Sequence, residues 1–121
     1  MDIVEIDSPL CVATCSLDAT IILFSLLEGS QIRVIHGDHR NGVRRLAYSP
    51  VLGGYLVSVG YEVTASVWAP ESVVSDNFLG KLKGHTKPVV EGTFIGRSPF
   101  LATVDKVNTV RIWDIKSFAC L

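Results

Sequence analysis

The residues best suited to chemistry in this sequence lie in one short segment, VIHGDHR, in which two histidines flank an aspartate. His36, Asp38 and His39 carry imidazole and carboxylate groups, which are good ligands for zinc or iron. Two ligands this close in one turn rarely converge on a metal without a third. A metal-binding or enzymatic protein that uses His36, His39 and the cysteines is therefore an alternative, and the leading interpretation requires no cofactor.

The three cysteines have a number and spacing that fit no disulfide framework. Cys11 and Cys15 would lie on the same side of a strand, and Cys120 stands near the other end of the sequence. An odd and sparse set of thiols is typical of proteins in a reducing compartment. We therefore expect an intracellular protein, located in the cytoplasm.

No other set of reactive residues has the spacing of a known catalytic motif. A nucleophilic serine or cysteine needs a base and an orienting group, and the sequence contains neither a nucleophile elbow nor a plausible triad. The glycines of GGYLVSVG are followed by neither a helix nor a lysine that could hold a phosphate. The sequence therefore favours a protein that is not an enzyme and acts by binding.

The composition narrows the class of partner. Of the 121 residues, 48% are hydrophobic, and the charged residues leave a formal net charge of -1, so no positive field attracts nucleic acid or an acidic membrane. The apolar stretch from Pro9 to Leu27 is long enough to suggest a membrane helix, but Asp18 near its centre would cost roughly 2.5 to 3.5 kcal/mol. We therefore expect protein or peptide partners, with no nucleic acid and no membrane.

The elements that must position these residues form an internal repeat. An aromatic residue recurs at Phe24, Trp68 and Trp113, at intervals of about 45 residues. The residues upstream match in the same register: Thr20, Thr64 and Thr109; Thr14, Ser58 and Thr103; His39 and His85 before the second and third aromatic. One register explains all these positions, so the chain is predicted to contain three copies of one structural unit.

Each copy reads as four short strands. In the second copy, VRRLAYSP, GYLVSVGYE, TASVWAP and LGKLKGH are rich in β-branched and aromatic residues and are separated by Pro, Gly or Asn. The continuous apolar runs TIILFSL and TVRIWDI suit strands that are buried on both faces in a stack of sheets. We predict an all-β chain that is one domain over residues 1–121, with repeats at about 2–37, 38–84 and 85–121.

The third copy resembles the repeat of the WD-repeat β-propeller family. The matching residues are Gly84-His85 and Trp113-Asp114 in the third copy, Asp38-His39 and Trp68-Ala69 in the second, and Phe24-Ser25 in the first. The resemblance implies one four-stranded antiparallel blade per repeat, arranged around a central channel. Because such rings have about four to eight blades, three blades form an incomplete ring. The remaining blades would come from a longer chain, or from identical chains that complete the ring as a homo-oligomer.

Blades of this family often contain a buried hydrogen-bonded set of Asp, His, Ser or Thr, and Trp. The aspartate position of that set is occupied by Glu62 in the second copy and by Val107 in the third, so the resemblance implies an incomplete network in both. In the first copy Phe24 cannot donate a hydrogen bond as Trp would. The residues that match the family's structural positions are His39, Ser58, Trp68, His85, Thr103, Trp113 and Asp114.

The resemblance also implies where a partner would bind. In this family the residue before the aspartate position and the residues that open the innermost strand face the channel entrance. The candidate partner-binding residues are Arg44, Tyr61, Lys87, Val90 and Lys106, together with Leu17. Tyr61 and Arg44 are the best anchors, because aromatic and guanidinium groups dominate interface energies. We predict a non-catalytic protein–protein interaction scaffold, and the cations make a reader of acidic or phosphorylated peptides an alternative.

Two further phrases, LVSVGYEVTASVW and LKGHTKPVVEGTF, are similar to those of long WD-repeat proteins that carry EF-hands and occur in ciliated or flagellated cells. The sequence contains no calcium loop of the D-x-D-x-D-G type, so calcium binding does not follow. The similarity adds the cilium as a second candidate location.

Overall fold

The described part of the chain consists of strands and turns. The computed structural model describes residues 2–6, 11–16, 18, 20–25, 29, 31–36, 42–50, 54–69, 78–96 and 98–121. Every regular element in these ranges is a β-strand, and none of the ranges contains a helix able to cross a membrane. The stretch from Pro9 to Leu27 contains two paired antiparallel strands in place of one long helix.

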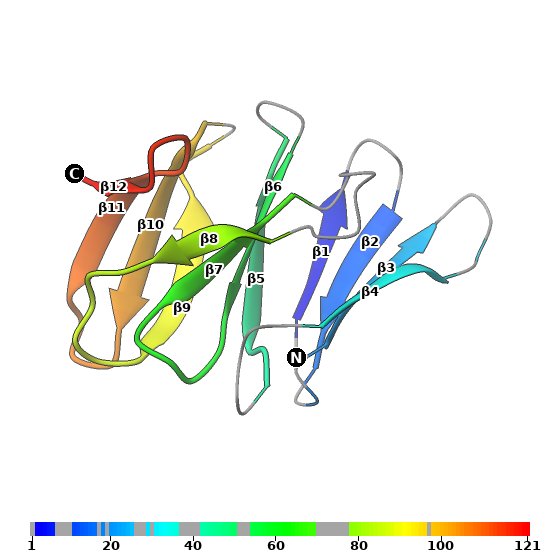
Figure 1. The fold of residues 1–121 in the computed structure, drawn as a ribbon, viewed down its shortest axis with the longest axis horizontal. Coiled ribbons are helices and arrows are strands. Elements are labelled where there is room, and N and C mark those ends of the chain that lie inside the picture. Colours follow the sequence, from blue (N-terminus) through cyan, green and yellow to red (C-terminus); the bar gives the residue numbers. More distant parts are fainter. Residues whose placement is uncertain are drawn as a thin grey trace.

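The strands form three four-stranded antiparallel sheets, in chain order (Figure 1). The first sheet contains β1 (Asp2–Ile6), β2 (Cys11–Cys15), β3 (Thr20–Ser25) and β4 (Gln31–His36). The second contains β5 (Arg45–Ser49), β6 (Tyr55–Val59), β7 (Ala65–Trp68) and β8 (Phe78–Leu82). The third contains β9 (Val89–Phe94), β10 (Phe100–Asp105), β11 (Val110–Asp114) and β12 (Ala119–Cys120). The predicted all-β arrangement is confirmed, and the sheets do not close into a ring.

The three sheets stand side by side, with the first strands of the sheets next to one another (Figure 1). β1 lies against β5, and β5 lies against β9. A register shift recurs directly before the aromatic position, between Leu23 and Phe24 in β3 and between Val67 and Trp68 in β7. The sequence repeat is therefore also a repeat of backbone irregularity, since a bulge bends the strand at the same point in both sheets.

Two apolar clusters hold the sheets together. Between the first and second sheets lie Ala13, Cys15, Ile21, Leu23, Val43, Leu46, Leu56 and Trp68. Between the second and third sheets lie Ala47, Val57, Val59, Ala65, Val67, Leu82, Val89, Leu101, Trp113 and Ile115. The second sheet contributes to both clusters because alternate residues of a strand point to opposite faces. This is the physical reason for its continuous apolar runs.

Candidate functional site

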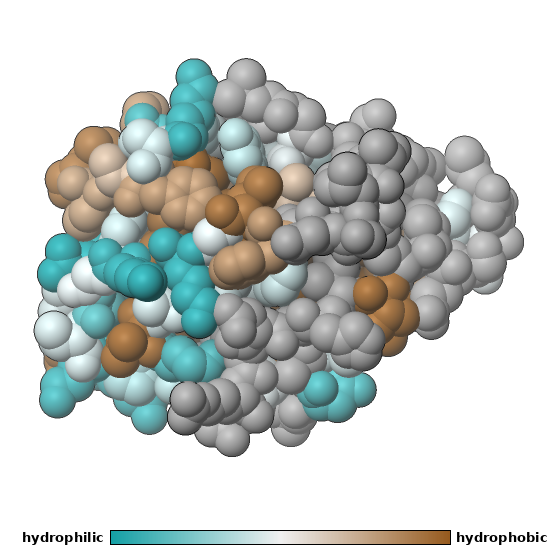
Figure 2. All heavy atoms as spheres, viewed as in Figure 1, coloured by the Kyte–Doolittle hydropathy of each residue, from teal (hydrophilic) through white to brown (hydrophobic). Residues whose placement is uncertain are grey.

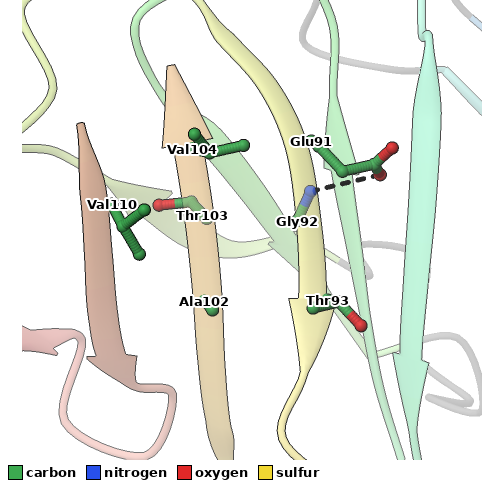
Figure 3. A pocket seen from close by; sticks show the side chains of 7 residues that line it. All are labelled: Glu91, Gly92, Thr93, Ala102, Thr103, Val104 and Val110. Carbon is green, nitrogen blue, oxygen red and sulfur yellow. Dashed lines mark hydrogen bonds between the residues drawn. The ribbon is translucent and has the colours of Figure 1, made fainter. Parts of the chain in front are cut away.

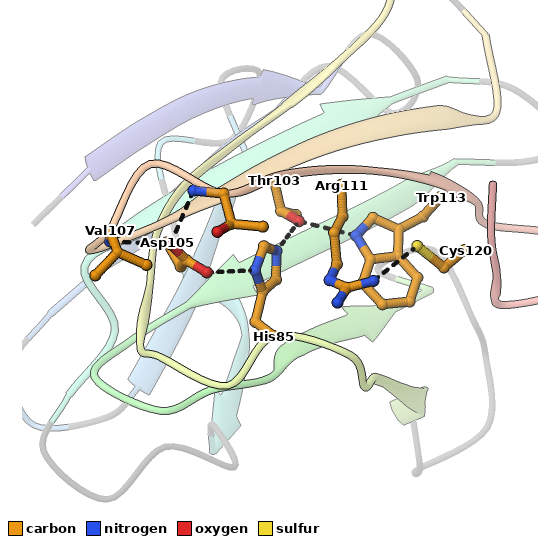
Figure 4. Close-up of polar contacts among 8 residues, drawn as sticks. His85, Thr103, Asp105, Val107, Arg111, Trp113 and Cys120 are labelled. Atoms are coloured by element: carbon orange, nitrogen blue, oxygen red, sulfur yellow. Dashed lines mark hydrogen bonds and ion pairs between the residues drawn. The ribbon is translucent and has the colours of Figure 1, made fainter.

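A buried chain of polar side chains crosses the third sheet (Figure 4). The Trp113 indole N–H donates to Thr103 Oγ1 at 2.8 Å, and the same oxygen lies 2.7 Å from His85 Nε2. His85 Nδ1 lies 2.9 Å from Asp105 Oδ2. All four residues are buried, so each polar atom depends on its protein partner in place of water.

The chemistry of the two end groups fixes the direction of the two outer hydrogen bonds. An indole N–H can only donate and an ionised carboxylate can only accept, so Trp113 donates to Thr103 and His85 Nδ1–H donates to Asp105. The direction of the middle bond depends on the protonation of His85: a ring without a proton on Nε2 accepts there from the Thr103 hydroxyl. A neutral His85 with its proton on Nδ1 satisfies every member of the network, which is the condition for such a network to stabilise a core.

Asp105 connects this network to the turn between β10 and β11. Its Oδ1 accepts hydrogen bonds from the amides of Val107 and Thr109, both at 3.0 Å. Within the turn Asn108 has a φ of 65°, a left-handed conformation that asparagine tolerates better than most residues. The carboxylate therefore serves both the buried histidine and the exposed turn.

The prediction of an incomplete network was wrong for the third sheet. The aspartate is Asp105, two residues before the expected position, which holds the exposed Val107. The sequence contained a signal for this, since residues two apart on a strand share a face and Asp105 follows Thr103 at that spacing. In the second sheet the Trp68 indole donates to Ser58 Oγ at 2.8 Å, while His39 lies outside the described residues.

The order Asp105, His85, Thr103 is that of a hydrolase triad, with an acid, a base and a hydroxyl. A nucleophile must reach a substrate, however, and Thr103 is only 2% exposed. Its hydroxyl oxygen also accepts the Trp113 N–H, so one of its lone pairs is already occupied. This arrangement stabilises the blade and has no access for hydrolysis.

The pKa of Asp105 lies below the ordinary aspartate value. Burial acts to raise this pKa, but hydrogen bonds from the Thr109 amide, the His85 ring and the Val107 amide outweigh burial. The pKa of Asp18, in the turn between β2 and β3, is also lowered, because the carboxylate accepts hydrogen bonds from Ser16 and Thr20.

Because the pKa values of these two carboxylates are lowered by folding, we expect acid to destabilise the chain. The unfolded chain takes up protons on Asp105 and Asp18 at a higher pH than the folded chain does, so stability is retained at neutral pH and falls as the pH drops below about 4. Thermal unfolding measured from pH 7 to pH 3 checks this expectation. Asp105→Asn should have a lower Tm at pH 7 and a smaller further loss on acidification. An equal loss in the variant and the unmodified chain would contradict the assignment.

At one end of the sheets, backbone hydrogen bonds tie the turns together. The pairs are Val43 N to Ser16 O (2.9 Å), Arg44 N to Val59 O (2.8 Å), Val89 N to Glu62 O (2.9 Å) and Lys106 N to Pro88 O (3.1 Å). They join the β2–β3, β6–β7 and β10–β11 turns to the segments that enter β5 and β9. We call this end the turn rim, defined by residues 42–44, 59–64, 86–90 and 105–109.

The candidate partner-binding residues all lie in the turn rim, except Leu17, which is outside the described residues. The Arg44 guanidinium carbon lies 4.9 Å from the centre of the Tyr61 ring, a cation–π contact. Lys87 and Lys106 are exposed, and Val90 is half-buried. Among the predicted residues, the structure thus brings Arg44 and Tyr61 into direct contact.

Next to these residues, Arg45 forms an ion pair that links two neighbouring sheets. Its Nε lies 3.2 Å from Glu91 Oε2, and both side chains are about half exposed. The pair connects the first strand of the second sheet to the first strand of the third. Because such exposed pairs contribute little to stability, its main effect is to neutralise one cation beside the turn rim.

The metal alternative gains no geometric support from the described residues. They contain no group of three or more His, Cys, Asp or Glu side chains close enough to hold a metal ion. His36 ends β4, and His39 lies outside the described residues. Cys15 is buried in the first apolar cluster, and Cys120 is exposed in β12, two sheets away.

Asp114 of the repeat signature accepts a turn hydrogen bond from the Lys116 amide at 3.0 Å.

Solved structures with the same arrangement of sheets include the WD40 repeats of RRP9 and the structure of U3-55K. Each matches 99% of this chain with a TM-score of 0.87 at 20% identity, and the match covers 36% and 37% of the solved chains. The chain has the WD40-repeat β-propeller fold. Each four-stranded sheet is one WD40-type blade, and the resemblance inferred from Trp113-Asp114 is confirmed.

Curated proteins that match this WD40-type chain fall into two groups. Cilia- and flagella-associated protein 337 B of Tetrahymena thermophila is 29% identical over 98% of this chain and 9% of its own length. A probable cytosolic Fe-S cluster assembly factor of Schizosaccharomyces japonicus is 31% identical over 85% of this chain and 17% of its own length. A probable cytosolic iron-sulfur protein assembly protein 1 of Emericella nidulans is 32% identical over 85% of this chain and 30% of its own length.

The chain therefore spans less than a third of the length of these curated relatives. No protein-family model matches it.

Proposed function

We propose that the chain is a non-catalytic scaffold that binds other proteins or peptides at its turn rim. The contact between Arg44 and Tyr61 is the observation that carries this proposal. Tyr61 is 40% exposed, so part of its side chain is available to a partner. Arginine and tyrosine are among the residue types that contribute most to protein interfaces.

The frame beneath this pair supports the proposal because it is rigid. The Arg44 amide N–H donates a hydrogen bond to the Val59 carbonyl, and the Val89 amide N–H donates one to the carbonyl of Glu62, in the turn that contains Tyr61. A side chain on a fixed backbone loses less conformational entropy when a partner binds. Loops on a rigid scaffold are the usual location of binding residues.

We propose that the partner is acidic or phosphorylated. The turn rim contains three cations, Arg44, Lys87 and Lys106, against the carboxylates of Glu62 and the buried Asp105, and the neighbouring Arg45 is paired with Glu91. A carboxylate or phosphate accepts charge-assisted hydrogen bonds from arginine and lysine. A guanidinium that lies against an aromatic ring is also oriented before its partner arrives.

The relatives support a location for this function. Two of those described above are named as cytosolic proteins, which is consistent with the cytoplasm as the location of this chain. The Tetrahymena relative is named for cilia and flagella, and the cilium is the second candidate location.

Peptide binding tests the proposal. Fluorescence anisotropy would compare three labelled peptides of equal length: one of alternating Glu and Ser, the same peptide with phosphoserine, and one with Lys in place of Glu. We expect the two acidic peptides to bind, the phosphorylated one more tightly, and affinity to fall with added salt. Arg44→Ala and Tyr61→Ala should each weaken binding by about tenfold or more.

Lys116→Ala is the matched control for lost charge. Lys116 is exposed in the turn between β11 and β12, at the opposite end of β11 from the turn rim, so its loss should leave the affinity unchanged. Equal binding of the Lys and Glu peptides would exclude an acidic partner. Unchanged affinities in both Arg44→Ala and Tyr61→Ala would exclude the turn rim as the binding surface.

A further inference from the structure

The cations of the turn rim fall at two points, one beside the second sheet and one beside the third. Arg44 directly precedes β5, and its guanidinium carbon lies 4.9 Å from the centre of the Tyr61 ring in the β6–β7 turn. Lys87 precedes β9, and Lys106 lies in the β10–β11 turn. The positive charge of the rim is therefore divided between neighbouring sheets.

A backbone hydrogen bond brings the two lysines of the third sheet to one place. The Lys106 amide N–H donates to the Pro88 carbonyl at 3.1 Å, and Pro88 directly follows Lys87. Both lysine side chains are exposed, and their four-carbon stems are long enough for both ammonium groups to reach one anion. We call the pair Arg44 and Tyr61 the first point, and the pair Lys87 and Lys106 the second point.

The carboxylates of the turn rim are less exposed than its lysines. Asp105 is buried, and its carboxylate is committed to His85 and to the amides of the β10–β11 turn. Glu62 is half-buried. The fully exposed charged side chains within the described rim residues are both cationic, which fits a ligand with negative charge.

Exposed apolar side chains lie beside both points. Tyr61 is 40% exposed at the first point, and Val107, which follows Lys106, is 59% exposed. Figure 2 shows hydrophilic surface with a smaller apolar area at this end of the third sheet, at the lower left of the view. A ligand that covers these side chains needs apolar groups as well as charge, so a peptide fits better than a free polyphosphate.

A hollow in the third sheet is a poorer candidate for the same ligand (Figure 3). It has a volume of about 180 Å³ and lies on the sheet, between β9 and the start of β11. Among the described residues that line it there is no cation, whereas Glu91 contributes a carboxylate. An anionic group would therefore be repelled from the hollow and attracted to the rim.

The distance between the two points follows from the repeat. Tyr61 and Lys106 occupy the same position in equivalent turns, three residues before the matching Thr64 and Thr109. Packed sheets lie about 10 Å apart, so the two points are separated by about that distance. In a polyproline II peptide, side chains three residues apart lie on one side at about 9 Å. In a β-strand, side chains on one side lie about 7 or 13 Å apart, which fits less well.

We propose that the turn rim binds an extended peptide that carries two anionic side chains three residues apart, each a phosphorylated serine or threonine or a glutamate. One anionic group contacts the guanidinium of the first point, and the other contacts the ammonium groups of the second point. This inference rests on the proposed function, because it specifies the acidic partner of the same surface. It adds that the partner needs two charges at a fixed separation.

Fluorescence anisotropy with labelled peptides of equal length tests the spacing. Each peptide has a background of proline and alanine, with one phosphoserine at a fixed position and a second phosphoserine one, three or six positions later. The reference peptide has alanine at the second position. We expect the three-residue spacing to bind most tightly, by about tenfold or more over the reference, because the second contact becomes intramolecular. Inorganic tripolyphosphate should compete poorly, since it has no apolar groups.

Variants of the two points test the assignment. Arg44→Gln removes the charge of the first point, and the double variant Lys87→Ala with Lys106→Ala removes that of the second. Each should reduce the affinity of the three-residue peptide to that of the reference and remove the preference for spacing. Lys116→Ala is the control, since Lys116 is exposed at the other end of β11. Far-UV circular dichroism checks that each variant is folded.

The possible failures of this inference differ from a failure of the proposed function. Equal affinities at all three spacings would overturn the fixed separation and would leave an acidic partner in place. Equal affinity of the reference and the three-residue peptide would overturn the second point. Displacement by tripolyphosphate as effective as that by the peptide would overturn the peptide as the ligand. If none of the phosphorylated peptides bound, both the inference and the proposed function would be wrong.

Discussion

Trp113→Ala is expected to lower the free energy of unfolding by about 3 to 5 kcal/mol, the usual cost of truncating a buried tryptophan. Trp113 is 1% exposed and packs in the cluster between the second and third sheets. Its loss would leave a cavity there and would remove the donor to Thr103. Because a domain of this size is stabilised by only about 5 to 15 kcal/mol, much of the variant could unfold at 37 °C. Urea unfolding followed by circular dichroism measures the change.

Trp113→Phe separates the apolar contribution from the hydrogen bond. Phenylalanine keeps most of the buried ring surface but has no N–H, and the first sheet already carries Phe24 at this position. We expect an intermediate loss of about 1 to 3 kcal/mol, because a smaller cavity remains and the Thr103 oxygen loses one partner. A loss below about 1 kcal/mol in Trp113→Ala would show that this side chain does not hold the two sheets together.

The fold could be predicted because several independent properties of the sequence repeat in one register. Phe24, Trp68 and Trp113 mark equivalent strands, and the apolar runs beside them are what strands buried on both faces require. Four short strands per copy follow from the Pro and Gly between them. These properties are local in sequence, so no knowledge of the packing was needed to recognise them.

The buried network was harder to predict because the family resemblance and the alternation of side chains along the strand point to different residues for the aspartate. The resemblance directed attention to Val107, whereas the alternation along β10 gives Asp105 the same face as Thr103. The strand period was the better guide. A carboxylate must point into the sheet packing to reach His85, and only strand geometry decides which residue does so.

The contact between Arg44 and Tyr61 could not be derived from spacing. The two residues are far apart in sequence. They meet because the Arg44 amide N–H donates a hydrogen bond to the carbonyl of Val59, which ends the strand before Tyr61. The sequence could assign both residues to one end of the blade, but the cation–π contact depends on rotamers that pattern analysis does not reach. The same holds for the ion pair between Arg45 and Glu91, which joins two sheets.

Thr103→Val is expected to lower the free energy of unfolding by about 2 to 4 kcal/mol with almost no change of shape, since it leaves two buried polar groups unpaired. Thr103 joins two other members of the network through one atom. Its hydroxyl accepts a hydrogen bond from Trp113 and donates one to the neutral ring of His85. Valine can do neither, so the indole N–H and His85 Nε2 would both be buried without a partner. Urea unfolding at one fixed protein concentration measures the loss.

Two further variants test whether the hydroxyl, and not the side-chain volume, is responsible. Thr103→Ser keeps both hydrogen bonds and removes one methyl group, so it should lose only about 1 kcal/mol. Thr109→Val makes the same change of side chain at an exposed position in the neighbouring turn and should stay within about 0.5 kcal/mol of the unmodified chain. If Thr103→Val were as stable as Thr103→Ser, the hydrogen bonds would contribute nothing beyond packing. The third blade would then be held by its apolar cluster alone.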